Sequence, residues 1–218
     1  MQVLDKDIIQ RIVHSPAMPR YISVLNDLWT KEKKKRKQFY EEMNESQKVE
    51  FIEGEIIVHS PAKDIHIAVQ QNLSAIVSTY VITKKLGKVR GEKALVRLTR
   101  NDFEPDLSYF SKVSASKIKD DTLFFPSPDL VIEILSTSTE KTDRGIKFKD
   151  YELHGVKEYW IVDTSKKIIE QYILQKGKFD LAVKAKTGEI NCNTLKGFSI
   201  PIAAIFDERK RIEFVKTI

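Results

Sequence analysis

The sequence is poor in the residues that cross-link a fold: it has one cysteine, Cys192, among 218 residues. A single cysteine excludes an intramolecular disulfide and any metal site built from several thiolates, so nothing calls for an oxidising compartment and we expect a cytoplasmic protein. Glycine and proline are also scarce, at 8 and 7 residues, and 41% of the chain is apolar. This composition excludes collagen-like and disordered chains and predicts a real hydrophobic core.

Long apolar runs are absent as well. The longest stretch without Lys, Arg, Asp or Glu, residues 65–83, contains Gln70, Gln71 and Asn72 near its middle, which indicates an amphipathic helix rather than a bilayer span. The first ten residues contain two acids and no apolar core, so we expect no secretory signal and no membrane association.

Several common functional motifs are missing. The sequence contains no GxxxxGK[ST], GxGxxG or GxSxG, which leaves P-loop, dinucleotide-binding and serine-hydrolase functions without support. The four histidines, at 14, 59, 66 and 154, show neither HxxxH nor HExxH spacing, so a zinc site is not expected.

The net charge of +6 is compatible with a nucleic-acid partner but does not require one. Residues 31–37, KEKKKRK, hold six basic side chains and one acid, whereas residues 38–50 hold four Glu and one Lys. A basic run on a helix is more commonly a solvated face than a phosphate-binding track. Because this one run accounts for most of the net charge, the total of +6 is weak evidence for a nucleic-acid partner.

Apolar spacing predicts a helical N-terminal extension over 1–46, with helices at 3–14 and from Tyr21 toward Met43, followed by one domain over 47–218. The domain begins with a hairpin turning at Glu53-Gly54. A helix over 63–86 follows, with Gly87 as its C-cap. Strands are predicted at 89–91, 94–98, 105–110, 130–135 and 158–162, with a helix over 141–154 before the last, and short strands to the end. This order predicts a mixed α/β fold with a strand–helix–strand unit.

Glu133 is the acid that most needs explanation, because it interrupts the apolar strand VIEIL. A buried carboxylate requires a partner or a metal ion, so a structural salt bridge is the alternative to a functional role. Asp129 lies four residues away on the same strand, about 13 Å along it, and cannot share a metal ion with Glu133. Asp106 can come from a neighbouring strand and lie roughly 5 Å from Glu133. We favour Asp106 with Glu133, and assign Asp129 to strand entry.

Two converging carboxylates without cysteine or clustered histidine favour Mg²⁺, or Mn²⁺, over zinc. Phosphodiester cleavage also needs a positive group, but position 135, two residues after Glu133, is Leu. The following helix offers Lys147, with Tyr151 on the same face at i, i+4, and Lys149, rotated about 200° from Lys147. Only one of these lysines is expected to reach the strand end, and an ordinary exposed position for Lys147 stays open.

The sequence contains the run EPDLSYF, then SPDLVIEILSTSTEKTDRGIKFKDYELHGVKEYWIVD, preceded by FIEGEIIVHSP and a helix with His66. This pattern resembles the Uma-type (Uma two) restriction endonuclease family of bacteria, a branch of the PD-(D/E)xK nuclease superfamily. The resemblance covers about residues 47–206. It implies a restriction-endonuclease-like core, a central mixed sheet flanked by helices, with Asp106 and Glu133 as metal ligands.

The resemblance also implies that Lys147 takes the role of the lysine that the superfamily has at the position of Leu135, with Tyr151 beside it. Glu53 and His66 match family positions and could line the site, although a turn Glu and a helix-edge His also have structural interpretations. Asp143 and Arg144 match too, and could pair with each other or orient the loop.

The leading hypothesis is a Mg²⁺-dependent endonuclease that hydrolyses DNA phosphodiester bonds, with Asp106, Glu133 and Lys147 as catalytic residues and a homodimer as a plausible assembly. The alternative is a non-catalytic nuclease-fold module that binds nucleic acid or a protein partner through residues 1–45. A third hypothesis is hydrolysis of a small phosphate ester at the same carboxylates.

Overall fold

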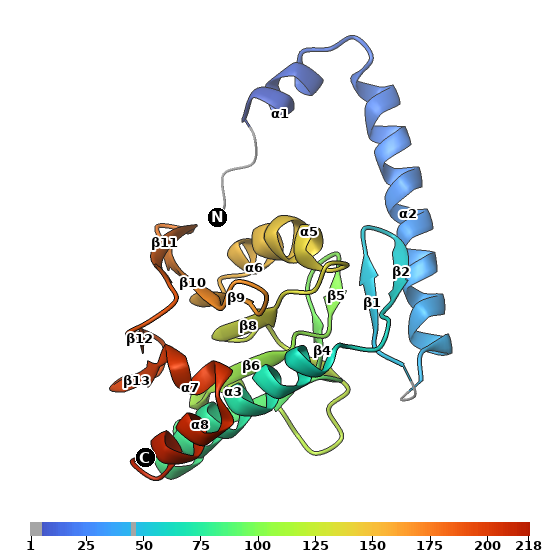
Figure 1. Ribbon diagram of the computed structural model, residues 1–218. Helices are drawn as coiled ribbons and strands as arrows, with labels where there is room; N and C mark the ends of the chain where they lie inside the picture. The colour runs from blue at the N-terminus through green and yellow to red at the C-terminus, as the bar shows by residue number, and fades with distance from the viewer. Residues whose placement is uncertain (1–5, 45–46) are drawn as a thin grey trace.

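The computed structural model describes residues 6–44 and 47–218, and it combines a long N-terminal helical arm with a mixed α/β body (Figure 1). The helices are α1 (Lys6–Val13), α2 (Met18–Glu42), α3 (Asp64–Thr83), α4 (Lys112–Ala115), α5 (Glu140–Thr142), the π-helical turn η1 (Asp143–Lys147), α6 (Phe148–Leu153), α7 (Ile202–Phe206) and α8 (Glu208–Val215). The strands are β1 (Val49–Ile52), β2 (Glu55–Val58), β3 (Gly87–Gly91), β4 (Leu95–Arg97), β5 (Asp102–Phe103), β6 (Leu107–Ser111), β7 (Phe124–Phe125), β8 (Leu130–Ile134), β9 (Glu158–Asp163), β10 (Ile168–Gln175), β11 (Lys178–Ala185), β12 (Glu189–Cys192) and β13 (Phe198–Pro201).

A six-stranded sheet forms the centre of the body, in the order β11-β10-β9-β8-β6-β3. β8 and β9 run parallel and are joined through α5, η1 and α6, while the remaining neighbours in this sheet are antiparallel. The predicted strand–helix–strand unit and the mixed central sheet flanked by helices are therefore confirmed.

The two faces of β8 explain its almost continuous apolar sequence. Leu130, Ile132 and Ile134 point into one buried cluster, and Val131 points into another on the opposite face. Since side chains alternate along a strand, Glu133 lies on the same face as Val131. The strand is covered on both sides, which is the arrangement that such a run predicts.

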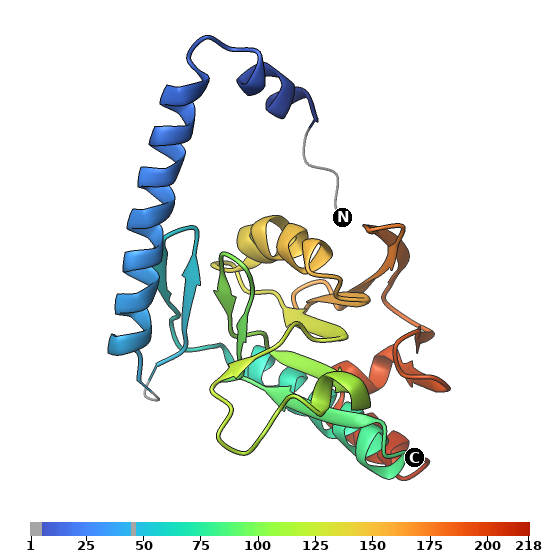
Figure 2. The ribbon, with the colours of Figure 1, turned by 180° about the vertical axis from the view of Figure 1, so that it is seen from behind.

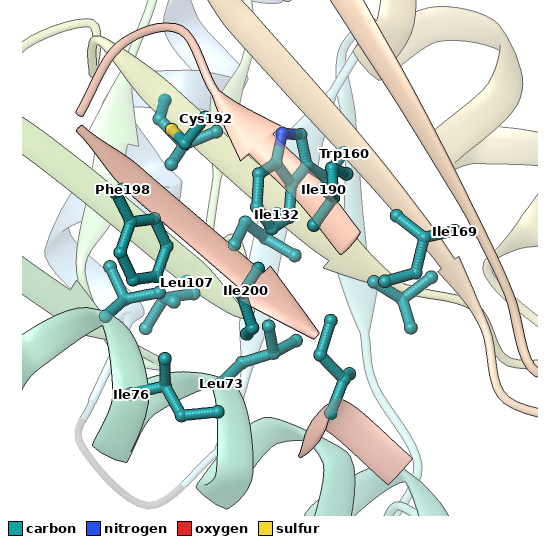
Figure 3. Close-up of a cluster of buried hydrophobic side chains, with 14 of the residues drawn as sticks. Leu73, Ile76, Leu107, Ile132, Trp160, Ile169, Ile190, Cys192, Phe198 and Ile200 are labelled. Atoms are coloured by element: carbon teal, nitrogen blue, oxygen red, sulfur yellow. The ribbon is translucent and has the colours of Figure 1, made fainter. Parts of the chain in front are cut away.

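One face of the six-stranded sheet packs on α3 and on the C-terminal elements. Figure 3 shows this cluster, in which Leu73 and Ile76 of α3 meet Ile132, Trp160 and Ile200. These side chains are fully buried. The apolar face of α3 therefore packs against the six-stranded sheet, on the side of the sheet opposite Glu133.

The other face meets a second sheet, ordered β2-β1-β5-β4-β7. Val96 and Phe103 of this sheet share a buried cluster with Val131 and Ile161 of the first sheet. The predicted hairpin is present as β1 and β2, paired from Val49–Val58 to Ile52–Glu55. This packing brings β1 toward the face of β8 that carries Glu133.

Two local predictions were wrong in detail. Gly87 does not cap α3: the left-handed residue after the helix is Lys85, with φ 53°, and Gly87 begins β3 with φ 152°. A Cβ at Gly87 would lie 2.0 Å from the carbonyl oxygen of Phe110, so this glycine permits close strand pairing. The helix expected over 141–154 is divided by a π-helical turn, η1.

Within residues 6–44 the N-terminal arm consists of the helices α1 and α2, and the start of the predicted first helix lies outside the described residues. α2 runs along the β1–β2 hairpin and continues beyond it to α1 (Figures 1 and 2). α1 buries no residue, whereas Phe39 near the end of α2 is 1% exposed. Within the described part of the chain, no helix is long and apolar enough to cross a membrane.

Some basic side chains of α2 form ion pairs with acids of the second sheet. Lys35 pairs with Glu55, and Arg36 pairs with the buried Asp102 of β5. Arg36 also donates to the carbonyl oxygens of Leu98 and Thr99, each at 2.8 Å. Arg36 thus attaches the arm to the second sheet.

Replacing Arg36 should destabilise the protein more than replacing its neighbours. The Arg36 side chain is 12% exposed and that of Asp102 is 0% exposed, so Arg36→Met leaves a buried carboxylate without its ion-pair partner. We expect a loss of about 3 kcal/mol in the free energy of unfolding, measured by denaturant titration. Lys37→Met is the control, because Lys37 and Glu41 form an exposed pair. Equal losses in both variants would contradict this account.

Candidate functional site

Asp106 and Glu133 lie opposite each other at the centre of the body. β6 and β8 pair with Leu107 facing Ile132, and continuing this register by one residue places Asp106 against Glu133. The backbone N–H of Ile134 donates to Oδ2 of Asp106 at 2.8 Å. Each of the two acids is 2% exposed. The structure therefore brings together the two carboxylates that the sequence analysis paired.

Lys147 of η1 lies among three carboxylates. Its Nζ is 2.9 Å from Oε1 of Glu50, 3.1 Å from Oε1 of Glu133 and 3.3 Å from Oδ1 of Asp143. The hydroxyl of Tyr151 donates to the same Glu133 oxygen at 3.0 Å. Lys147 is 2% exposed, which excludes the ordinary surface position that the sequence left open, and Lys149 points to solvent instead.

Glu50 was missed by the sequence analysis. It is fully buried on β1, where Oε2 lies 2.9 Å from Nε2 of His59 and Oε1 accepts the backbone N–H of Glu104 at 2.9 Å. The available signal was the one that identified Glu133: an acid enclosed by apolar residues, here in VEFI. What the sequence does not show is that β1, a strand of the second sheet, packs toward β8 of the first sheet.

A second group of charged side chains lies on the other side of Asp106. Nζ of Lys48 is 2.8 Å from Oδ1 of Asp106 and 3.6 Å from Oε1 of Glu92. Nε2 of His66 is 3.4 Å from the same Asp106 oxygen. His66 thus contacts Asp106, whereas neither Lys48 nor Glu92 was singled out from the sequence.

Two acids named in the sequence analysis lie elsewhere. Glu53 occupies the β1–β2 turn with φ 50°, its side chain is 54% exposed, and its contact is Arg100 at 3.5 Å. The structure does not bring Glu53 into the cluster. Asp129 precedes β8, where it accepts the backbone N–H of Ser111 and pairs with Lys157, which fits the strand-entry role.

The surroundings of these acids shift their pKa values in opposite directions. Burial, together with the negative charges of Asp143 and Asp106, raises the pKa of Glu133 to about 8, although Lys147 opposes this shift. Burial would also raise the pKa of Glu50, but Lys147 and His59 outweigh it and lower that pKa to about 2. For Asp106, His66 and Lys48 overcome burial and hold the pKa well below its usual range.

The contact network is rich in carboxylates. Glu50, Asp106, Glu133 and Asp143 are all buried, and the ammonium groups of Lys48 and Lys147 lie among them. Carboxylate oxygens are also the ligands that Mg²⁺ and Mn²⁺ prefer, so the donor set fits such an ion.

A pocket reaches this network from the side of β2. It has a volume of about 90 Å³, and Glu50, Asp143 and Lys147 line it. Its polar wall is formed by side chains that can donate hydrogen bonds: His59, Ser60, Ser138, Thr139 and Thr142. Lys147 is therefore nearly buried but borders this pocket.

Sequence and fold both relate this chain to known proteins. The sequence model of the Uma2 family, described as "Putative restriction endonuclease", matches residues 36–203. The chain belongs to the Uma2 family. The match begins earlier than the resemblance noted from residue 47, because it includes the end of α2 that carries Arg36 and Phe39.

A solved structure supports the fold of this Uma2 protein. The chain resembles the crystal structure of a "putative nuclease belonging to DUF820" from Anabaena variabilis ATCC 29413, with a TM-score of 0.67 and 18% identity over 81% of this chain and 96% of the other. No curated protein matches the chain. The family supports a nuclease, and the structural neighbour shows a nuclease-like fold.

The raised pKa of Glu133 predicts a pH-dependent stability. With chelator present, folded Glu133 retains a proton up to about pH 8 that the unfolded chain releases near 4.5, so its contribution to stability is lost as pH rises across this window. The side chain of Glu133→Gln cannot titrate, so this variant should not lose the corresponding stability. The free energy of unfolding of Glu133→Gln minus that of wild type should therefore increase by more than about 2 kcal/mol between pH 5 and pH 8. Denaturant titrations at both pH values measure this difference. A constant difference would show that Glu133 is ionised throughout.

Proposed function

We propose that this Uma2 protein is a metal-dependent endonuclease that hydrolyses DNA phosphodiester bonds. The observation that carries the proposal is the pairing of Asp106 with Glu133, two buried carboxylates from neighbouring strands in a network of four buried carboxylates. Such carboxylates are costly in a protein interior unless a cation or a proton compensates them. The family, whose model is described as a putative restriction endonuclease, supports a nuclease function.

Asp106 and Glu133 would hold Mg²⁺, or Mn²⁺, and this ion would polarise the phosphate and lower the pKa of a bound water. Lys147 contributes a fixed positive charge beside Glu133 and borders the pocket, where it balances the charge of a phosphate. Tyr151 donates to Glu133 and so fixes the orientation of its carboxylate. His66 holds the opposite side of Asp106.

The substrate assignment rests on the polar pocket wall and the family. The hydroxyl groups of Ser60, Ser138, Thr139 and Thr142 can donate to phosphate oxygens at the pocket entrance. We assign no substrate contact to Glu53, which pairs with Arg100 outside the pocket. A homodimer in the cytoplasm would supply two such sites for the two strands of DNA.

The proposal predicts metal-dependent cleavage that requires both carboxylates. Purified protein should nick plasmid DNA with Mg²⁺ or Mn²⁺ and not with chelator. Asp106→Asn and Glu133→Ala should each lower the rate at least about 100-fold, because each removes a metal ligand. Asp129→Asn is the matched control: it neutralises an acid of the same β6–β8 region that lies outside the network.

Parallel substrates separate the alternatives. Single-stranded DNA, RNA and a small phosphodiester in the same assay identify the substrate class, and competition by oligonucleotides distinguishes a nuclease from a small-ester hydrolase. Binding of DNA without cleavage under every metal condition, unchanged in Glu133→Ala, would favour a non-catalytic module over an enzyme.

A further inference from the structure

Lys48 has an unusual position among the basic side chains of the body. It lies one residue before β1, where its carbonyl oxygen accepts the backbone N–H of His59, and it is two residues from Glu50. Residues two apart on a strand share a face, so continuing the alternation of β1 by one residue puts Lys48 on the same face as Glu50. Lys48 there contacts Asp106, and Glu50 contacts Lys147. Its side chain is 19% exposed.

The ammonium of Lys48 lies among groups that could themselves hold a cation. The ligand atoms of His66, Glu92 and Asp106 all lie within 4.8 Å of one another, and Lys48 is in ion-pair contact with two of these three residues. Asp106 is also one of the two acids assigned to the metal. A positive charge of the protein thus lies on a carboxylate oxygen that the proposed function gives to Mg²⁺ or Mn²⁺.

Lys147 does not occupy an equivalent position. It is 2% exposed and is held by Glu50, Glu133 and Asp143 together, so removing its ammonium would leave three carboxylates without their shared partner. Lys48 is more exposed and is held mainly by one oxygen of Asp106, with Glu92 at a longer distance. A long lysine side chain at the edge of the cluster can move away at lower cost.

We propose that Lys48 is the resident counter-ion of Asp106 in the metal-free protein and competes with the divalent cation for this carboxylate. This inference rests on the proposed function, since it requires Asp106 to be a metal ligand. Lys48 keeps the buried Asp106 paired while no metal is bound. It also weakens metal binding, because the cation must displace an ammonium or tolerate its repulsion. Lys48 therefore sets the metal concentration at which the site fills.

The test is the affinity for Mn²⁺ of the full-length protein, measured by electron paramagnetic resonance of the free ion. Lys48→Met should lower the dissociation constant about tenfold or more, because it removes the competing charge. Lys48→Arg keeps the charge and should stay near wild type. Lys157→Met is the matched control, since Lys157 pairs with a buried Asp that has no part in the network.

Thermal unfolding gives a second readout that does not depend on activity. In chelator, Lys48→Met should have a lower melting temperature than wild type, because Asp106 loses its partner. When Mn²⁺ is added, the melting temperature of Lys48→Met should rise by more than that of wild type. An unchanged or weaker Mn²⁺ affinity in a folded Lys48→Met would overturn the inference. If that variant does not fold, Lys48→Gln, which removes the charge but retains a hydrogen-bond donor, carries the same expectation.

Asp106→Asn separates this inference from the function on which it rests. If wild type binds Mn²⁺ and Asp106→Asn does not, the metal site stands, and the affinity of Lys48→Met alone decides the role of Lys48. If wild type binds no Mn²⁺ at all, the metal-dependent function is overturned, and the competition with Lys48 is overturned with it.

Discussion

The buried ammonium of Lys147 is the interaction on which the rest of the site depends. It joins η1 to Glu133 of the first sheet and to Glu50 of the second, so one charge connects η1, β8 and β1. Without it, three carboxylates would lie together in a nearly water-free interior, which is strongly unfavourable. The position of Lys147 therefore fixes how closely the two sheets approach around Glu133.

Pairing within one sheet made part of this site predictable from the sequence. Alternation along β8 identifies Glu133 as an acid inside a covered strand, and a neighbouring strand is the natural source of Asp106. Helical spacing likewise linked Lys147 to Tyr151, and both reach the same oxygen of Glu133. These relations follow from local geometry, which the sequence encodes directly.

Contacts between the two sheets were not predictable in the same way. Glu50 and Lys48 reach the site because β1 packs over the first sheet, and no periodicity in the sequence specifies that approach. Glu53 was the more conspicuous acid in the same hairpin, but its left-handed turn conformation leaves its side chain mostly exposed. The π-helical turn η1 escaped prediction for a similar reason: apolar spacing indicates a helix but not a local change of its winding.

The presence of Leu at position 135 follows from the same packing. Leu135 is 7% exposed and belongs to the apolar cluster that includes Tyr151, Val156 and Tyr159. A lysine at this position would place its stem among aromatic and aliphatic side chains, whereas Leu135 fills this apolar cluster without a charge to desolvate. The ammonium groups beside the two carboxylates come from elsewhere: Lys147 of η1 contacts Glu133, and Lys48, one residue before β1, contacts Asp106.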